Sequence, residues 1–249
     1  MVSFAETLLF SAIMGLSIFL SLPVVLKRQM SNSLRKMLLA IAIGILVFLM
    51  ADVFTDVTPD LYNGSLYGYG SSLFFDVLFT VSLVVGFFAL FYIESRSKTG
   101  LTPVQLSLLI ALGIGLQNLT EGLVFGSLGV ALGLTGVTLV VLIGFTFQNM
   151  TEGFPIVSPF LGRMDRRMAV LLGLFLVGGV PTILGGAIGF YYNSRIFDVL
   201  FDGLAIGAIL YVVLPMLKVL LGGTDLLQQR IAYVGIFIGF AIGFIVNLL

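Results

Sequence analysis

Long apolar segments separated by short polar connections make up this chain. Eight of these segments reach about 20 residues, the length that a helix needs to cross the hydrocarbon core of a bilayer. They cover residues 4–26, 37–58, 72–93, 104–126, 137–160, 168–190, 198–220 and 230–249. The pattern predicts an all-α, polytopic membrane protein with eight transmembrane helices, in which residues 1–249 form a single transmembrane domain. We expect the first segment to be a retained helix, because it lacks the positive n-region and cleavage site of a signal peptide.

The amino-acid composition narrows the class of protein and the kinds of metal site. Hydrophobic residues make up 59% of the chain and charged residues 10%, which is too apolar for a soluble domain of this length. Twelve basic residues balance twelve acidic ones, so no excess of positive charge favours a nucleic-acid partner. Cys and His are absent. A metal site would therefore use oxygen ligands, with a few Met sulfurs as the alternative.

The positions of the basic residues predict the orientation of the helices. Only Arg195 lies in an even-numbered connection, whereas the odd-numbered connections hold or adjoin the other eleven: Lys27, Arg28, Arg35, Lys36, Arg96, Lys98, Arg163, Arg166, Arg167, Lys218 and Arg230. By the positive-inside rule the odd-numbered connections are cytoplasmic. Both termini are then extracytoplasmic, and we expect the protein in the cell membrane.

The fourth and fifth segments carry the same polar insert. It reads Gln-Asn-Leu-Thr-Glu-Gly over residues 117–122 and Gln-Asn-Met-Thr-Glu-Gly over residues 148–153. Both inserts fall near the bilayer midplane on antiparallel helices, and Gln and Glu four residues apart share one helix face. A glutamate at this depth costs about 2.5–3.5 kcal/mol on insertion scales. We therefore expect one central polar site built from Gln117, Glu121, Gln148 and Glu152, with Asn118 and Asn149 beside it.

Two interpretations of the inserts follow from their chemistry. Two carboxylates in a low dielectric repel each other unless a proton or a cation lies between them, and amide oxygens can complete the shell of a divalent ion. The sharper interpretation is thus a cation site on a permeation path, which we favour because the motif is duplicated. The alternative is that the amides and hydroxyls only hold the two helices together.

Further acidic residues lie toward the predicted outer ends of other segments. Asp52 and Asp56 form an i, i+4 pair near the end of the second segment, and Asp202 lies in the seventh. Unpaired carboxylates at an outer face concentrate cations, so these three are candidates for a vestibule or relay. We interpret Asp60 and Asp198 as ordinary helix-end acids.

These features resemble the ZIP (Zrt-, Irt-like) family of divalent-metal transporters, in particular its short prokaryotic branch. The resemblance rests on eight spans, outward termini and the paired Asn-x-x-Glu-Gly inserts on the fourth and fifth helices. A Gly- and Ala-rich stretch at residues 203–213 is similar to the family's seventh helix. This chain has Gln where the family has His, and Thr120 and Thr151 where it has Pro. Val180-Pro181 stands where the family's sixth helix often carries Glu-Pro.

The resemblance implies a carrier whose central metal site opens to each side in turn, by sliding of one helix group against another, and it implies a homodimer. The metal is then the transported substrate, and no further cofactor is expected. Because carboxylates and amides are harder ligands than His, we expect a broad divalent-metal carrier of the Mn, Fe and Zn class rather than a zinc-specific one. The missing Glu at Val180 leaves both a mononuclear and a binuclear site open.

Three functions compete on the sequence alone. The first is uptake of divalent metal cations into the cytoplasm by a protein embedded in the lipid bilayer. The alternative is a carrier of another cation or solute, in which the carboxylates relay protons. An intramembrane enzyme is disfavoured, because the chain has no His or Cys for a nucleophile–base pair.

Overall fold

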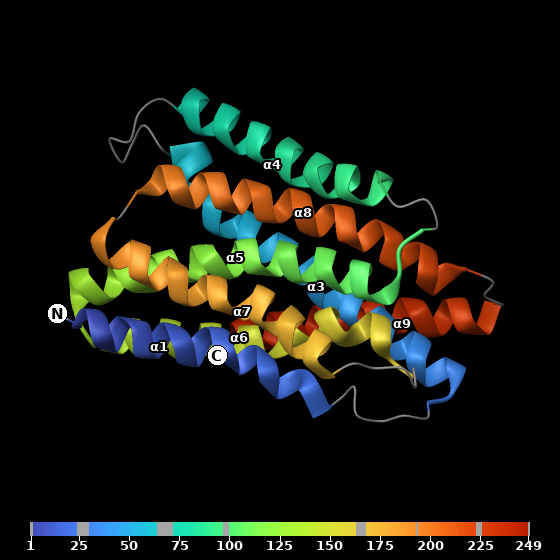
Figure 1. The fold of residues 1–249 in the computed structure, drawn as a ribbon. Coiled ribbons are helices and arrows are strands. Elements are labelled where there is room, and N and C mark those ends of the chain that lie inside the picture. Colours follow the sequence, from blue (N-terminus) through green and yellow to red (C-terminus); the bar gives the residue numbers. More distant parts are fainter. Residues whose placement is uncertain are drawn as a thin grey trace.

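The computed structural model describes residues 2–23, 30–63, 72–96, 100–162, 168–192, 194–222 and 226–248, and within these ranges it contains helices and no strand (Figure 1). The helices are α1 (Phe4–Leu16), η1 (Ser17–Ser21), α3 (Asn32–Asn63), α4 (Ser72–Ser95), α5 (Pro103–Leu132), α6 (Gly136–Val157), η2 (Ser158–Phe160), α7 (Met168–Tyr191), α8 (Arg195–Leu221) and α9 (Leu226–Asn247). Eight helical stretches in this part of the chain are long and apolar enough to cross a membrane. The predicted all-α fold is confirmed for the described residues, and these eight stretches match the eight predicted segments in number.

Local sequence explains where two of these helices begin. Ser3 caps α1, because its hydroxyl accepts from the backbone N–H of Glu6 while the Glu6 carboxylate accepts from the N–H of Ser3 at 2.7 Å. Thr102 and Gln105 form the same reciprocal arrangement at the start of α5. Such capping boxes satisfy backbone donors that the helix itself cannot pair. The Glu6 carboxylate therefore caps the N-terminus of α1.

The first predicted segment, 4–26, corresponds to a candidate span over Phe4–Ser21, which is not one continuous α-helix. Helix α1 ends at Leu16 and is followed by the 3₁₀ turn η1; residues 22 and 23 are again α-helical, and residues 24–29 lie outside the described ranges. Two serine hydroxyls of η1 donate to backbone carbonyls of α6: Ser17 to Thr146 at 2.8 Å and Ser21 to Met150 at 3.2 Å. These contacts hold the tightened turn against α6.

The helices form two groups. In the first group α7 packs against α5 and α1, and α6 packs against η1 and α5; in the second, α4 packs against α8 and α3 against α9 and α8. Figure 1 shows α4 beside α8 along one edge of the bundle and α1 along the opposite edge. The groups meet mainly where α5 contacts α8, with further contacts of α6 to α3 and α9. We call them the α5 group (α1, η1, α5, α6, α7) and the α8 group (α3, α4, α8, α9).

Glycines bring the backbones together inside each group. A Cβ atom added at Gly185 of α7 would lie 2.1 Å from the carbonyl oxygen of Leu119 in α5. In the α8 group, a Cβ at Gly86 of α4 would lie 2.2 Å from the Leu204 carbonyl of α8. Between the groups, the contact at Gly113 of α5 is less close, since a Cβ there would meet the nearest atoms of α8 at 3.5 Å. Small residues of this kind are typical of close helix packing in membranes.

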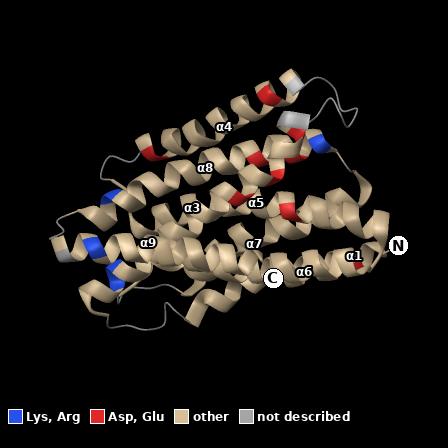
Figure 2. Ribbon diagram, turned by 180° about the vertical axis from the view of Figure 1, so that it is seen from behind, with Lys and Arg blue, Asp and Glu red and all other residues tan. Residues whose placement is uncertain are grey.

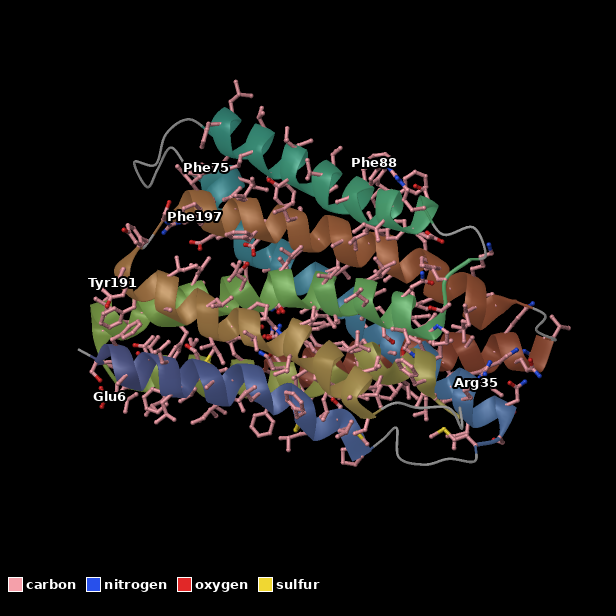
Figure 3. All side chains as sticks on the ribbon, in the orientation of Figure 1. Glu6, Arg35, Phe75, Phe88, Tyr191 and Phe197 are labelled. Atoms are coloured by element: carbon pink, nitrogen blue, oxygen red, sulfur yellow. The ribbon has the colours of Figure 1, made fainter. Side chains whose placement is uncertain are left out.

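Charge separates along the bundle. Figure 2 shows most of the drawn Lys and Arg residues at one end, where α3 and α9 begin and α8 finishes, and most Asp and Glu residues in the other half. Glu6 and Arg35 mark these opposite ends in Figure 3. Six of the basic residues used to predict orientation lie outside the described ranges: Lys27, Arg28, Lys98, Arg163, Arg166 and Arg167. The basic residues within the described ranges lie mostly at one end of the bundle, which is the asymmetry from which the orientation was predicted.

Candidate cation site

The two polar inserts lie on facing stretches of α5 and α6, and their Gln, Asn and Glu side chains are buried. Glu121 is 4% exposed and Glu152 is 1% exposed. The glycine after each glutamate does not contact the other insert. It lies against the backbone of a third helical element. A Cβ at Gly122 would lie 2.2 Å from the Thr182 carbonyl of α7, and one at Gly153 would lie 2.3 Å from the Ile18 carbonyl of η1. Each insert is thereby packed against another element of the α5 group on its glycine side.

Glu121 joins the two inserts directly. The side-chain amide of Gln117, one turn earlier on α5, donates to one of its carboxylate oxygens. The amide of Asn149 on α6 donates to the other oxygen at 2.7 Å and also to the backbone carbonyl of Phe145 at 2.9 Å. Gln117 and Glu121 thus share one face of α5, and the two helices present their inserts to each other.

Glu152 has no such support. Within the described part of the chain, neither of its carboxylate oxygens has a hydrogen-bond partner. The amides of Gln148 and Asn118 approach it outside ordinary hydrogen-bond geometry. Gln148 instead donates to Asp52 at 3.3 Å, and Asn118 donates to the Gly178 carbonyl of α7 at 3.0 Å. Glu152 is also close enough to Glu121 for the two carboxylates to repel each other when both are charged.

Five buried oxygens around the inserts lack a hydrogen-bond partner among the described residues. They are the two carboxylate oxygens of Glu152 and the amide oxygens of Gln117, Asn118 and Asn149. Buried polar atoms are normally satisfied, and each exception needs an explanation. All five are acceptors, which is the ligand type that hard cations take. We call them the central oxygen cluster.

A cavity of about 520 Å³ connects Glu121 to the acidic half of the bundle. It opens between the two helix groups, with walls from α3, α5, α6, α8 and α9. Its acidic lining residues are Asp52, Asp56, Asp60, Glu121, Asp198 and Asp202. The three vestibule candidates therefore share one cavity with Gln117 and Glu121. Gln148, Asn149, Glu152 and Asn118 do not line it and lie behind its wall. We call it the acidic cavity.

Asp60 and Asp198 were interpreted as ordinary helix-end acids, but both line the acidic cavity. Asp60 accepts from Arg195 at 2.5 Å, so this ion pair joins α3 to α8 at the cavity wall. This contact could not be predicted from the sequence, because the two residues lie far apart in the chain. Their proximity depends on the pairing of helices within the α8 group.

Asp202 and Asp52 occupy different places in the cavity. Asp202 is buried to 5% exposure beside the Thr120 hydroxyl of α5 and within electrostatic reach of Asp56. Asp52 is half-buried, and each of its oxygens accepts from one amide: Gln148 at 3.3 Å and Asn247 of α9 at 2.7 Å. Asn247 was not among the predicted site residues, and its position after a long apolar run carries no signal for such a role.

The donor set suits a cation held by mixed oxygens. In the described ranges no three acidic side chains lie close enough together to hold a metal ion by themselves. A divalent ion here would therefore take Glu121 and Glu152 together with amide oxygens of the inserts. Val180 and Pro181 lie in α7 and add no carboxylate. The neighbouring Thr182 hydroxyl is buried and unpaired among the described residues.

No protein-family model matches this chain, and no curated protein matches it either.

Proposed function

We propose that this protein is a transmembrane carrier of divalent metal cations of the Mn, Fe and Zn class, working by alternating access, and not an enzyme. The observation that carries the proposal is the central oxygen cluster. Two mutually repelling carboxylates, one of them with both oxygens unpaired, lie beside three unpaired buried amide oxygens, and a divalent cation would stabilise this arrangement. The resemblance of the paired inserts to those of ZIP transporters supports the same function.

The acidic cavity supplies a route to the edge of this cluster, at Gln117 and the neighbouring Glu121. Carboxylates along a low-dielectric passage raise the local concentration of cations and repel anions. Because the cavity begins in the acidic half of the bundle and reaches Gln117 and Glu121, cations from that side would meet the site first. With the basic end cytoplasmic, both termini outward and the protein in the cell membrane, transport would proceed as uptake into the cytoplasm.

A panel of divalent cations tests the proposal. Purified protein in liposomes is expected to take up at least one of Mn²⁺, Fe²⁺, Zn²⁺, Co²⁺ and Cd²⁺ with saturable kinetics, whereas protein-free liposomes take up none. Transport of none of these ions would contradict the proposal.

A carrier of another cation or solute is the second candidate, favoured because no three-carboxylate group is present in the described ranges. Metal-independent proton flux would support that candidate.

The proposed orientation has its own test, because the chain contains no Cys. Leu248→Cys places one thiol at an exposed position just beyond α9, and Asn32→Cys places one at the exposed start of α3. In intact cells a membrane-impermeant maleimide is expected to label the first variant and not the second. Permeabilised cells should give labelling of both. The reverse pattern in intact cells would contradict outward termini.

A further inference from the structure

The carboxylate of Asp52 is held from both helix groups at once. It projects from α3 into the acidic cavity, and each of its oxygens takes one amide donor. Asn247 of α9 belongs to the same group as Asp52, whereas Gln148 of α6 belongs to the other group. A displacement between the groups would therefore strain the hydrogen bond from Gln148 but not the one from Asn247.

The two bonds also differ in length. The Asn247 amide lies 2.7 Å from one oxygen of Asp52, which is a short, charge-assisted contact. The Gln148 amide lies 3.3 Å from the other oxygen, beyond the usual range for an N–H donor. The bond within the α8 group is thus the stronger, and the bond between groups is the one that breaks first.

Asp52 lies near the central carboxylates but does not form one metal-binding group with both of them. It is within electrostatic reach of both Glu121 and Glu152. Within the described residues, however, no three carboxylates are placed to hold one ion. Asp52 can therefore bind a cation separately from the central oxygen cluster.

We propose that Asn247 is a positioning residue, which holds the Asp52 carboxylate toward the cavity so that it captures the cation before the cation moves to Glu121 and Glu152. This inference rests on the proposed function, since it assigns a role within that transport path. Asn247 does not touch the cation itself. Its amide fixes one oxygen of Asp52, and the arriving cation takes the place of the weak Gln148 donor on the other.

The nature of α9 supports a dedicated role for this side chain. Asn247 is the last residue of the helix, and from Ile231 onward Tyr233 is the only other residue of α9 with a polar side-chain group. An asparagine at a helix end commonly bonds to its own backbone. This one instead crosses to α3 and faces the acidic cavity.

The test uses Asn247→Leu, which keeps the approximate size of the side chain and removes the donor. Partners that orient a metal ligand typically contribute 10–100-fold to affinity, so we expect the KM for uptake to rise about 10-fold while the maximal rate stays within about 2-fold. Asn247→Gln keeps an amide and is expected to restore part of the KM. Asn32→Leu makes the same change at an exposed position of α3 and should have no effect.

A double-mutant cycle separates positioning from a general effect on folding. Because Asn247 acts through Asp52, adding Asn247→Leu to Asp52→Asn is expected to change the KM no further. Uptake is measured in proteoliposomes with each metal of the panel alone, beginning with Mn²⁺. Wild-type uptake with an unchanged KM in Asn247→Leu, or an additive effect in the double variant, would overturn this inference alone. Absence of wild-type uptake for every ion would overturn the proposed function and this inference with it.

Discussion

Glu152→Gln is expected to abolish cation uptake, with a loss of about 100-fold or more, because even residues that only orient metal ligands contribute 10–100-fold. Glutamine has the shape of glutamate but removes the negative charge that a divalent ion would need. The fold should tolerate the change, since neither oxygen of Glu152 has a hydrogen-bond partner in the described part of the chain. We therefore expect the thermal midpoint of cation-free protein to be no lower than that of wild type.

Cation-dependent stability gives a second readout for the same variant. A ligand that binds only the folded state at 100 times its dissociation constant stabilises that state by about 2.7 kcal/mol. Wild-type protein should therefore melt at a higher temperature when the transported metal is present, and Glu152→Gln should not. Glu94→Gln at the end of α4 is the matched control and should behave as wild type. Wild-type uptake rates in Glu152→Gln would remove Glu152 from the site.

Gly185→Ala is expected to lower stability strongly, because the added methyl group would lie 2.1 Å from the backbone carbonyl of Leu119. A backbone atom cannot move aside as a flexible side chain can, so α5 and α7 must separate. Overpacking of this kind costs about 1–3 kcal/mol, which corresponds to a fall of about 5–10 °C in the thermal midpoint at the upper part of that range.

The control for this prediction lies on the same helix. A Cβ at Gly173 meets nothing within 4 Å, so Gly173→Ala should leave the thermal midpoint unchanged or raise it. The chain has no Trp, and thermal unfolding in detergent is therefore better followed by size-exclusion chromatography than by tryptophan fluorescence. Equal midpoints for Gly185→Ala and Gly173→Ala would show that the α5–α7 contact has room for a side chain.

Hydropathy was sufficient to predict eight long apolar helices, because a segment that crosses a bilayer must satisfy its backbone internally and expose apolar side chains to lipid. It was less reliable at their ends. The second span was predicted over 37–58, whereas α3 runs over Asn32–Asn63. Its extra turns carry Asp60, which lowers local hydropathy but is paired with Arg195 in the fold. Such partners, distant in sequence, cannot be inferred from a local pattern.

Helical periodicity also accounts for part of the candidate site. The spacing of Gln117 and Glu121 predicts one shared face, and the structure has a hydrogen bond between them. The contact of Asn149 with Glu121 is less accessible to sequence reasoning, since it depends on how α5 and α6 rotate against each other. Asn247 is less accessible still, because its role requires that the last helix pack against the second.

The contrast between the glycine contacts within and between helix groups has a mechanical consequence. Inside each group, glycines at positions such as Gly185 and Gly86 leave no space for even a methyl group, so neighbouring helices are locked in register. Between the groups, Gly113 faces α8 at ordinary van der Waals distance. A shearing displacement would therefore concentrate in the plane between α5 and α8 and leave each group internally rigid. The acidic cavity opens between the same two groups, so a small slip there would change its width while the two inserts stayed together.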